Sequence, residues 1–312
     1  MAKFIMVMGL PYSGKTTWAK EYCERTGAKL VSAEMIAYDL YGDAPLINTV
    51  KVHRIMEQNS IQYLQQGYDV VYDSLNLNAK KRAGVLKQLT HALGGRFTTE
   101  CVLMLCPIEE CIKRERKKKK TTDYSKVRSS LLEFQPPYFN EGWNDITIEG
   151  LNDISDDEAM ATQIALYKRT VDYDQGNSHH RLTLDDHINV AAEAYEHPAY
   201  PSTLYWAARW HDIGKPDCRV FDDKGEAHYY GHEYVSAYYW LCSAMAVRLF
   251  KMGKEQPRYY MPLRVAALIC WHMIPYHDKD WTDTVKWLKN RGFDQQFIEL
   301  LEYLHKADKF AH

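Results

Sequence analysis

A glycine-bounded loop near the start constrains this chain more than any other feature. Residues 9–16, GLPYSGKT, satisfy the pattern G-x-x-x-x-G-K-[ST]. The apolar run 3–8 precedes the loop and the helical stretch TTWAKEYCERTG follows it, so the loop lies between a strand and a helix, as the motif requires. Glycines let backbone N–H groups and the helix N-terminus face phosphate oxygens. The sequence therefore predicts a triphosphate site.

The residues of this loop have distinct expected roles. We expect ATP with Mg²⁺ as the cofactor pair, and we expect the nucleotide to be bound by residues of the loop and of the helix start, namely Gly9, Ser13, Gly14, Lys15, Thr16 and Thr17. Lys15 reaches the β and γ oxygens and is a catalytic residue, while the Thr16 hydroxyl holds Mg²⁺.

The spacing of apolar runs predicts the fold class. Runs at 30–33, 69–73 and 101–106 follow the first strand, and segments of helical length at 50–66 and 80–93 separate them. This alternation predicts an α/β fold, a parallel sheet with flanking helices, over residues 1–150. Residues 151–158 are acidic and turn-rich, and later segments have helical length without convincing strands. We therefore expect a linker at 151–170 and an all-α helical bundle at 171–312.

Composition limits the partners and the location of the protein. A length of 312 residues suits two domains, and 46% hydrophobic with 26% charged residues is typical of globular proteins. The net charge of −2 excludes a global attraction to nucleic acid, so such contacts need a local basic patch. Seven cysteines without a C-x-x-C pair indicate reduced, mostly buried thiols. The chain starts with a strand and has no apolar run near 18 residues, so we expect a cytoplasmic protein without membrane contact.

The one biased segment, KRERKKKKTTDYSKVR at 113–128, is strongly basic. One interpretation is a solvated helix face. The alternative is a mobile lid whose cations hold ATP or a polyanionic acceptor, with 117–120 following a nucleic-acid backbone.

Four further segments extend the pattern of the first half. They are SAEMIAYDLYGD (32–43), YDSLNLNAKKR (72–82), CPIEECIKRERK (106–117) and FQPPYFNEGWNDI (134–146). Together with the phosphate loop they resemble the 5′-hydroxyl polynucleotide kinases, which implies an α/β P-loop kinase fold for residues 1–150. The last of them resembles the tail that marks the end of that domain.

This resemblance implies roles for residues outside the loop. Glu34 would accept the proton of the attacking hydroxyl, and Asp73 would order the magnesium shell or the acceptor, although a helix cap is the alternative for Asp73. Arg82 would contact phosphate. Arg114 would be the lid arginine that stabilises the transferring phosphoryl group, with Arg116 in reserve. Ala37 stands where the family has an arginine, which favours a different acceptor or a substitute cation.

The last 140 residues contain three short motifs in which histidine and aspartate lie close together in sequence. HDIGKP (211–216), DDHINV (185–190) and LHKADK (304–309) resemble the HD phosphohydrolase superfamily. The resemblance implies one or two divalent transition metal ions, held by ligands that converge within a helical bundle: His187, His211, Asp212, His232, His272 and Asp308. It implies phosphoester hydrolysis with Asp212 and Lys215 as catalytic residues, although Lys215 could instead favour a helix end.

The remaining histidines are assigned to ordinary packing, including His197, His228, His305 and His312. His180 is a borderline candidate for binding substrate phosphate.

The pairing of the two halves suggests nucleic-acid end healing. In this hypothesis one half phosphorylates 5′-OH ends with ATP and the other removes 2′ or 3′ phosphate, or opens a 2′,3′-cyclic phosphate. RNA is favoured over DNA, and a ligase would act downstream. A small-molecule or nucleoside kinase fused to an HD nucleotidase is the alternative, and Ala37 favours it. A third possibility is an ATP-binding, RNA-binding sensor with a degenerate kinase.

Overall fold

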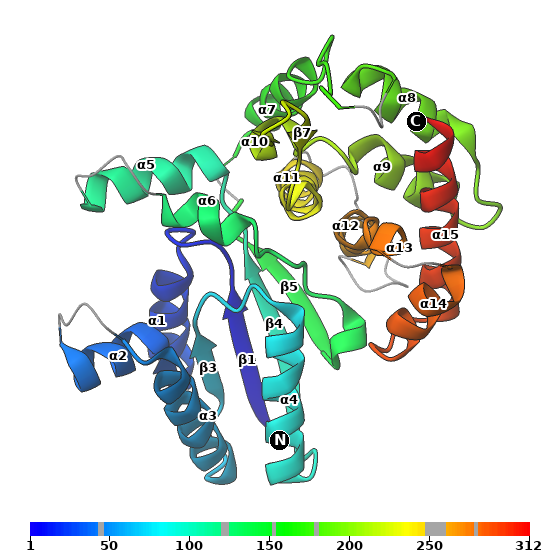
Figure 1. Cartoon of the computed structure of the whole chain (residues 1–312). Helices are drawn as coiled ribbons and strands as arrows, with labels where there is room; N and C mark the ends of the chain where they lie inside the picture. Colours follow the sequence, from blue (N-terminus) through cyan, green and yellow to red (C-terminus); the bar gives the residue numbers. More distant parts are fainter. Residues whose placement is uncertain (43–46, 120–124, 152–153, 178–180, 247–259, 278–279) are drawn as a thin grey trace. The chain divides into compact units, whose positions relative to one another are not determined.

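The computed structural model divides the chain into two compact units (Figure 1). It describes residues 1–42, 47–119, 125–151, 154–177, 181–246, 260–277 and 280–312. The first unit consists of Met1–Ser130 and Glu141–Gly150, and the second of Leu131–Asn140 and Leu151–His312.

The first unit contains a five-stranded parallel sheet in the order β2-β3-β1-β4-β5. The strands are β1 (Ala2–Met8), β2 (Lys29–Ser32), β3 (Val70–Asp73), β4 (Phe97–Met104) and β5 (Asp145–Glu149). The predicted parallel sheet with flanking helices is confirmed. Strand β5 was not predicted; it begins at the end of the segment 134–146 and runs beyond it.

Helices cover both faces of this sheet because the central strands are buried on both sides. Ile5, Val7 and Val71 face helix α1 (Lys15–Thr26), whose Ala19 and Trp18 pack against them. The opposite face carries Phe4 and Tyr72, with ring centroids 5.6 Å apart. Helix α3 (Thr49–Gln65) lies on that side, since His53 Nδ1 is 3.3 Å from the Tyr72 hydroxyl.

The other helices of the first unit follow the strands in sequence. They are α2 (Ala33–Tyr41), α4 (Ala79–Leu93), α5 (Ile108–Lys119) and α6 (Lys126–Leu131), which runs one residue into the second unit. Asn48 and Asn78 cap α3 and α4, because each side-chain oxygen accepts a hydrogen bond from a backbone N–H three residues on.

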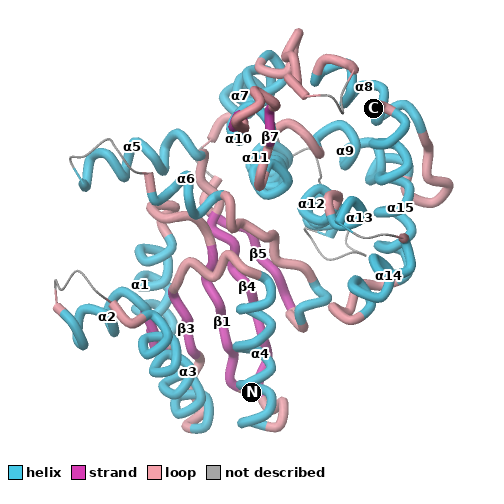
Figure 2. Tube along the Cα trace, in the orientation of Figure 1, coloured by secondary structure: helices cyan, strands magenta, loops and turns pink. Residues whose placement is uncertain are grey.

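The second unit is built almost wholly from helices (Figure 2). The long ones are α7 (Asp156–Lys168), α8 (Leu184–Ala194), α9 (Pro201–Trp210), α11 (His232–Ala246), α12 (Tyr260–Trp271) and α15 (Gln295–Phe310), and the shorter ones are α10 (Lys215–Cys218), α13 (Ile274–His277) and α14 (Trp281–Lys289). Trp210 and Trp240 are fully buried with ring centroids 5.6 Å apart, and they anchor α9 against α11.

Three features of this unit differ from expectation. Residues 156–168 of the expected linker form helix α7, whose Ser155 and Glu158 make a reciprocal capping box. A two-stranded antiparallel ribbon, β6 (Val220–Phe221) and β7 (Ala227–His228), interrupts the helices. Residues 131–140 belong to this unit as well, because Phe134 packs edge-on against Tyr238 and Tyr138 packs against Phe297.

All seven cysteines lie among the described residues as thiols outside any disulfide, and five of them are buried. Among the helices described, none combines the length and the apolar character that crossing a lipid bilayer demands.

Candidate functional site

The phosphate loop joins the end of β1 to the first turn of α1, and two glycines make its path possible. Gly9 has φ +150°, and a Cβ there would lie 2.5 Å from the Met104 carbonyl oxygen. Gly14, at φ +99°, adopts a backbone conformation that L side chains rarely take. Any other residue at either position would strain the loop, so the glycines of the motif have a steric cause.

Two buried polar side chains point into this loop. The Lys15 ammonium donates to the Leu10 carbonyl at 2.6 Å, and burial lowers its pKa to about 8. The Ser13 hydroxyl is buried and makes no hydrogen bond within the part of the chain that the structure describes. A buried cation and an unsatisfied hydroxyl beside a helix N-terminus suit a polyphosphate, which would provide acceptor oxygens for both.

A carboxylate lies beside the loop at the end of β3. The Thr16 hydroxyl donates to Asp73 Oδ2 at 3.0 Å, and the Ser32 hydroxyl donates to the same oxygen at 3.2 Å. Burial raises the pKa of Asp73, and these two hydrogen bonds and the Lys15 charge oppose that rise. The oxygens of Thr16 and Asp73 are the hard ligands that Mg²⁺ prefers, so the residues present fit this ion.

Two residues predicted for this site, Thr17 and Glu34, are exposed. Thr17 is exposed on α1, and Glu34 is exposed in the first turn of α2. The Glu34 charge acts on the pKa of both Asp73 and Lys15. Ala37 follows on the same helix, in which no residue is buried. The carboxylate of Glu34 therefore lies near the loop and is open to an acceptor from solvent.

Arg114, which was predicted as the lid arginine, contacts the phosphate loop. Arg114 Nη1 donates to the Tyr12 carbonyl at 3.1 Å, and its Nε donates to Glu110 at 3.0 Å. Arg116 is exposed on the same helix. Of the lysines expected to follow a nucleic-acid backbone, 117 and 118 are exposed on α5, while position 120 lies outside the described residues.

Part of the basic segment is structural. Glu115 is buried, and its carboxylate accepts hydrogen bonds from the Ser125 hydroxyl at 2.7 Å and the Lys126 backbone N–H at 2.9 Å. These contacts tie α5 to the start of α6. One acidic residue of the segment is thus used for packing and not for solvation.

Arg82 is held by groups of the protein itself. Its side chain is fully buried and paired with Glu141 at 2.6 Å, and its Nη1 donates to the carbonyls of Asn76 and Leu77. The anion beside this guanidinium is a carboxylate 59 residues away in the chain, and the phosphate contact of Arg82 stays a prediction.

The second unit brings together all six residues that were predicted as metal ligands. His187 Nε2 lies 3.2 Å from His211 Nε2, 3.3 Å from Asp212 Oδ2 and 3.2 Å from Asp308 Oδ1. His211 Nε2 is 3.4 Å from each of the same two carboxylate oxygens. These residues come from α8, the α9–α10 turn and α15, and each is at most 4% exposed.

Two further histidines form a neighbouring group on the other oxygen of Asp212. His232 Nε2 lies 3.0 Å from Asp212 Oδ1 and 3.3 Å from His272 Nε2. His272 Nε2 is 3.7 Å from the same oxygen. The two oxygens of Asp212 thus face different histidine pairs, which is the arrangement of a carboxylate that bridges two cations.

Backbone carbonyls determine which nitrogen each histidine presents. The Nδ1 atoms of His187, His211, His232 and His272 lie 2.6–3.1 Å from the carbonyl oxygens of Ala311, Ala208, Tyr229 and Ile269, respectively. A carbonyl only accepts, so each Nδ1 carries the proton and each Nε2 of a neutral ring presents a lone pair. Four lone pairs and two carboxylates that converge in a buried space require positive charge among them.

The pKa values of the cluster also indicate that a positive charge is needed among these side chains. Burial alone would lower the pKa of His211, but Asp212 and Asp308 raise it to about 10. Burial would raise the pKa of Asp212 and of Asp308, but the His211 charge holds both values well below their usual range. Burial, with His211 and His232 nearby, lowers the pKa of His272 to about 3. The nitrogen and oxygen donors present fit a divalent transition metal ion, which would supply the missing charge.

Two neighbours support the aspartates. The Lys215 ammonium is buried, 2.6 Å from Asp212 Oδ2, and donates to the Gln175 side-chain oxygen at 2.7 Å. The Tyr276 hydroxyl donates to Asp308 Oδ2 at 2.9 Å. Lys215 was predicted as a catalytic residue or as a cation at a helix end, and its ammonium lies against the Asp212 carboxylate.

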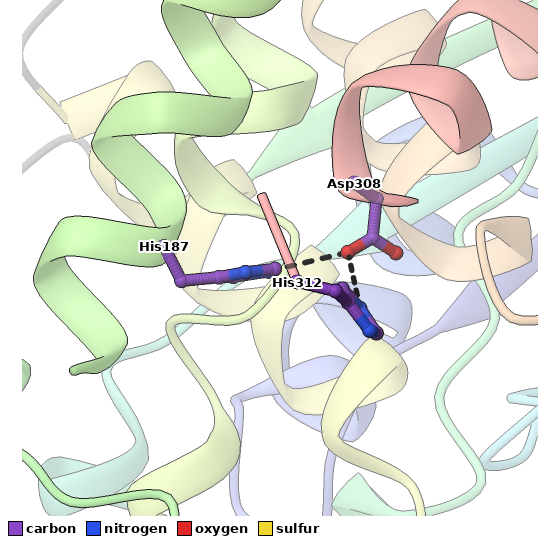
Figure 3. A group of neighbouring side chains, drawn as sticks. All are labelled: His187, Asp308 and His312. Atoms are coloured by element: carbon purple, nitrogen blue, oxygen red, sulfur yellow. Dashed lines mark ion pairs between the residues drawn. The ribbon is translucent and has the colours of Figure 1, made fainter. Parts of the chain in front are cut away.

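One residue of this site was not predicted. His312 was assigned to ordinary packing, yet His312 Nε2 lies 3.3 Å from Asp308 Oδ1 (Figure 3). The signal that could have indicated it is its short spacing of four residues from Asp308, which follows from the sequence alone. His180 lies outside the described residues.

Comparisons with known proteins concern the first unit. Residues 4–139 match the model of a family described as an AAA domain. The chain is also similar to three solved structures: a putative kinase from Chloroflexus aurantiacus (16% identity, 41% of this chain and 74% of that chain, TM-score 0.36), the Pnkp1/Rnl/Hen1 RNA repair complex (18%, 43% and 46%, 0.34) and a gluconokinase from Sinorhizobium meliloti (14%, 47% and 81%, 0.33). No curated protein matches the chain.

The parallel sheet and the glycine-bounded loop between β1 and α1 give the first unit the architecture of a P-loop nucleotide-binding domain. The second unit is a helical domain that carries a histidine–aspartate cluster.

Proposed function

We propose that the chain is a bifunctional enzyme that phosphorylates 5′-OH ends of nucleic acid with ATP and removes 2′, 3′ or 2′,3′-cyclic phosphate from such ends. One observation supports each of the two activities. The contact of Thr16 with Asp73 next to buried Lys15 supports the kinase. Four histidine Nε2 atoms and two aspartates gathered in one buried cluster support an HD-type phosphohydrolase.

In the kinase half, this chain's residues position charge around the transferred group. Lys15 and Arg114 lie at the loop from two sides, since one donates to the Leu10 carbonyl and the other to the Tyr12 carbonyl. Both cations are placed to neutralise charge on the phosphoryl oxygens. Glu34 is an exposed carboxylate available to accept the proton of the acceptor hydroxyl.

In the hydrolase half, six ligands would hold one or two divalent ions, with Asp212 between them. Such ions act as Lewis acids on phosphate esters and activate water near neutral pH. Lys215 keeps Asp212 oriented through its 2.6 Å contact, and Tyr276 does the same for Asp308 at 2.9 Å. The domain ranges that we propose follow the two units, with the hydrolase carried by the second.

A second function keeps the kinase chemistry and changes the acceptor to a nucleoside or a small metabolite. The observation that favours it is helix α2, which carries Ala37 where an acceptor-binding arginine was expected and has Met35 and Tyr38 exposed on it. A helix of this kind offers apolar contact rather than positive charge to an acceptor. In that case the second unit would act as a nucleotidase.

The test compares acceptors and ends directly. Transfer of labelled γ-phosphate from ATP is measured on a 5′-OH RNA oligonucleotide, the matching DNA, and a panel of nucleosides. In parallel, phosphate release is measured from 3′-phosphate and 2′,3′-cyclic phosphate ends with Mn²⁺, Co²⁺ or Ni²⁺ added. We expect RNA to be labelled and its 3′ end to be dephosphorylated. Labelling of nucleosides with an inert oligonucleotide would reject end healing in favour of the second function.

A further inference from the structure

A histidine outside the predicted ligand set meets the cluster from its most exposed side. His312 Nε2 lies 3.3 Å from Asp308 Oδ1, and its side chain is 30% exposed, against 0% for that of His187. His187 and His312 approach the same oxygen of Asp308 from two directions (Figure 3). Three imidazoles, those of His187, His211 and His312, therefore surround one carboxylate oxygen at 3.2–3.4 Å.

The segment that carries His312 is already part of the site. Ala311, the residue before it, is buried, and its carbonyl oxygen lies 3.1 Å from His187 Nδ1. The end of α15 thus orients one ligand through its backbone and carries Asp308, and His312 follows just beyond the helix end, four residues after Asp308. A displacement of this segment would disturb three groups of the cluster together.

Tyr276 contacts both Asp308 and His312. Its hydroxyl donates to Asp308 Oδ2 at 2.9 Å, and its ring lies nearly parallel to that of His312, with a 13° angle and 6.1 Å between centroids. The carboxylate is therefore fixed through one oxygen, and the other oxygen stays directed at the imidazoles. The His312 ring is placed by an aromatic neighbour as well as by the helix end.

We propose that His312 is a further ligand of the metal ion held by His187, His211, Asp212 and Asp308, and that it binds on the solvent-facing side. The nitrogen and oxygen donor atoms of His187, Asp308 and His312 all lie within 4.8 Å of one another, a separation suited to one ion with nitrogen and oxygen donors near 2.1 Å. Because it is more exposed than the other ligands, His312 is the ligand that an incoming phosphate ester can displace. This inference rests on the proposed metal site of the second unit.

The experiment uses the full chain freed of metal and titrated with Co²⁺. Affinity is followed by calorimetry, and coordination by visible d–d absorption. We expect His312→Ala to weaken binding at the first site by at least about tenfold and to change the absorption band, because water replaces an imidazole nitrogen. Free imidazole at millimolar concentration should restore the wild-type band, since the truncated side chain leaves room for it. His312→Gln should lose the band as the alanine variant does.

The matched control is His228→Ala. His228 belongs to the same unit, is similarly exposed at 37%, and is paired with Asp222 at the same 3.3 Å. The His228→Ala variant should keep the wild-type Co²⁺ affinity and the wild-type absorption spectrum. Wild-type affinity and spectrum in His312→Ala, or a change that imidazole does not reverse, would overturn the inference and leave the proposed hydrolase intact. A wild-type chain that binds no Co²⁺ would reject both.

Discussion

Arg82 and Glu141 form a two-point ion pair across 59 residues of sequence. The Nε and Nη2 groups of Arg82 donate to the two carboxylate oxygens of Glu141 at 2.7 and 2.6 Å, and both side chains are at most 5% exposed. Trp143 Nε1 also donates to this carboxylate at 3.2 Å. The pair fastens the start of α4 to the segment that leads into the edge strand β5.

Arg82→Ala should destabilise the first unit by about 3–5 kcal/mol, because it leaves the Glu141 carboxylate buried without its partner. Urea unfolding, followed by fluorescence, measures the change. Lys3→Ala is the control, since its pair with Glu100 at 3.1 Å is 42% exposed on the lysine side and is expected to contribute about 0–1 kcal/mol. Equal losses for the two variants would contradict a structural role for Arg82.

ATP affinity should depend on the charge of Lys15. Its pKa is lowered to about 8 by burial, and bound phosphate favours the protonated form, so ATP binding is constant below pH 8. Above pH 8 the free lysine loses its proton first, and affinity should fall by up to about tenfold per pH unit. Titrations with ATP between pH 6.5 and 9.5 measure this. Lys15→Arg keeps its charge in that range and should show a flat profile; a flat wild-type profile would refute the assignment.

The lid arginine should act on turnover rather than on nucleotide binding. Arg114→Ala is expected to lower the rate of phosphoryl transfer by about 10³–10⁵ with little change in the dissociation constant of ATP. Arg116→Ala, on the same helix and equally exposed, is the matched control and should retain nearly full activity. If Arg116→Ala lost phosphoryl transfer and Arg114→Ala kept it, Arg116 would be the lid arginine.

The two activities should separate by mutation. Lys15→Ala is expected to lower phosphoryl transfer by about 10²–10³ and to spare phosphate release, because Lys15 belongs to the phosphate loop alone. Asp212→Ala should do the reverse, since Asp212 contacts four histidines and a lysine of the cluster. Circular dichroism confirms folding of each variant. Loss of both activities in a folded single variant would contradict independent sites.

Metal should stabilise the second unit. An ion at 100 times its dissociation constant adds about 2.7 kcal/mol to the native state, which corresponds to a rise in Tm of about 5–10 °C for a domain of this size. Thermal unfolding of chelator-treated protein with and without Mn²⁺ or Co²⁺ measures the shift. In Asp212→Asn the shift should largely disappear, because both histidine pairs share this carboxylate. An equal shift in that variant would place the ion elsewhere.

Local sequence was sufficient for the parts of the protein that depend on neighbours in the chain. The loop at 9–16 requires its glycines for steric reasons and needs the lysine and threonine at the helix start, so motif and geometry coincide. Apolar runs predict four strands of the sheet, because β1 and β3 are buried on both faces and β4 over its second half. Strand β5 was not predicted because only alternate residues of it are buried, so it forms no continuous apolar run.

Tertiary structure decided the partners of charged groups. Nothing within a few residues of Arg82 shows that Glu141 will neutralise it, or that Lys215 will face Asp212 and Gln175. Sequence order placed His187, His211, His232 and His272 in one set, but only folding brings the Ala311 carbonyl to His187 and His312 to Asp308. A side chain's role depends on which groups remove it from water, and those groups come from distant segments.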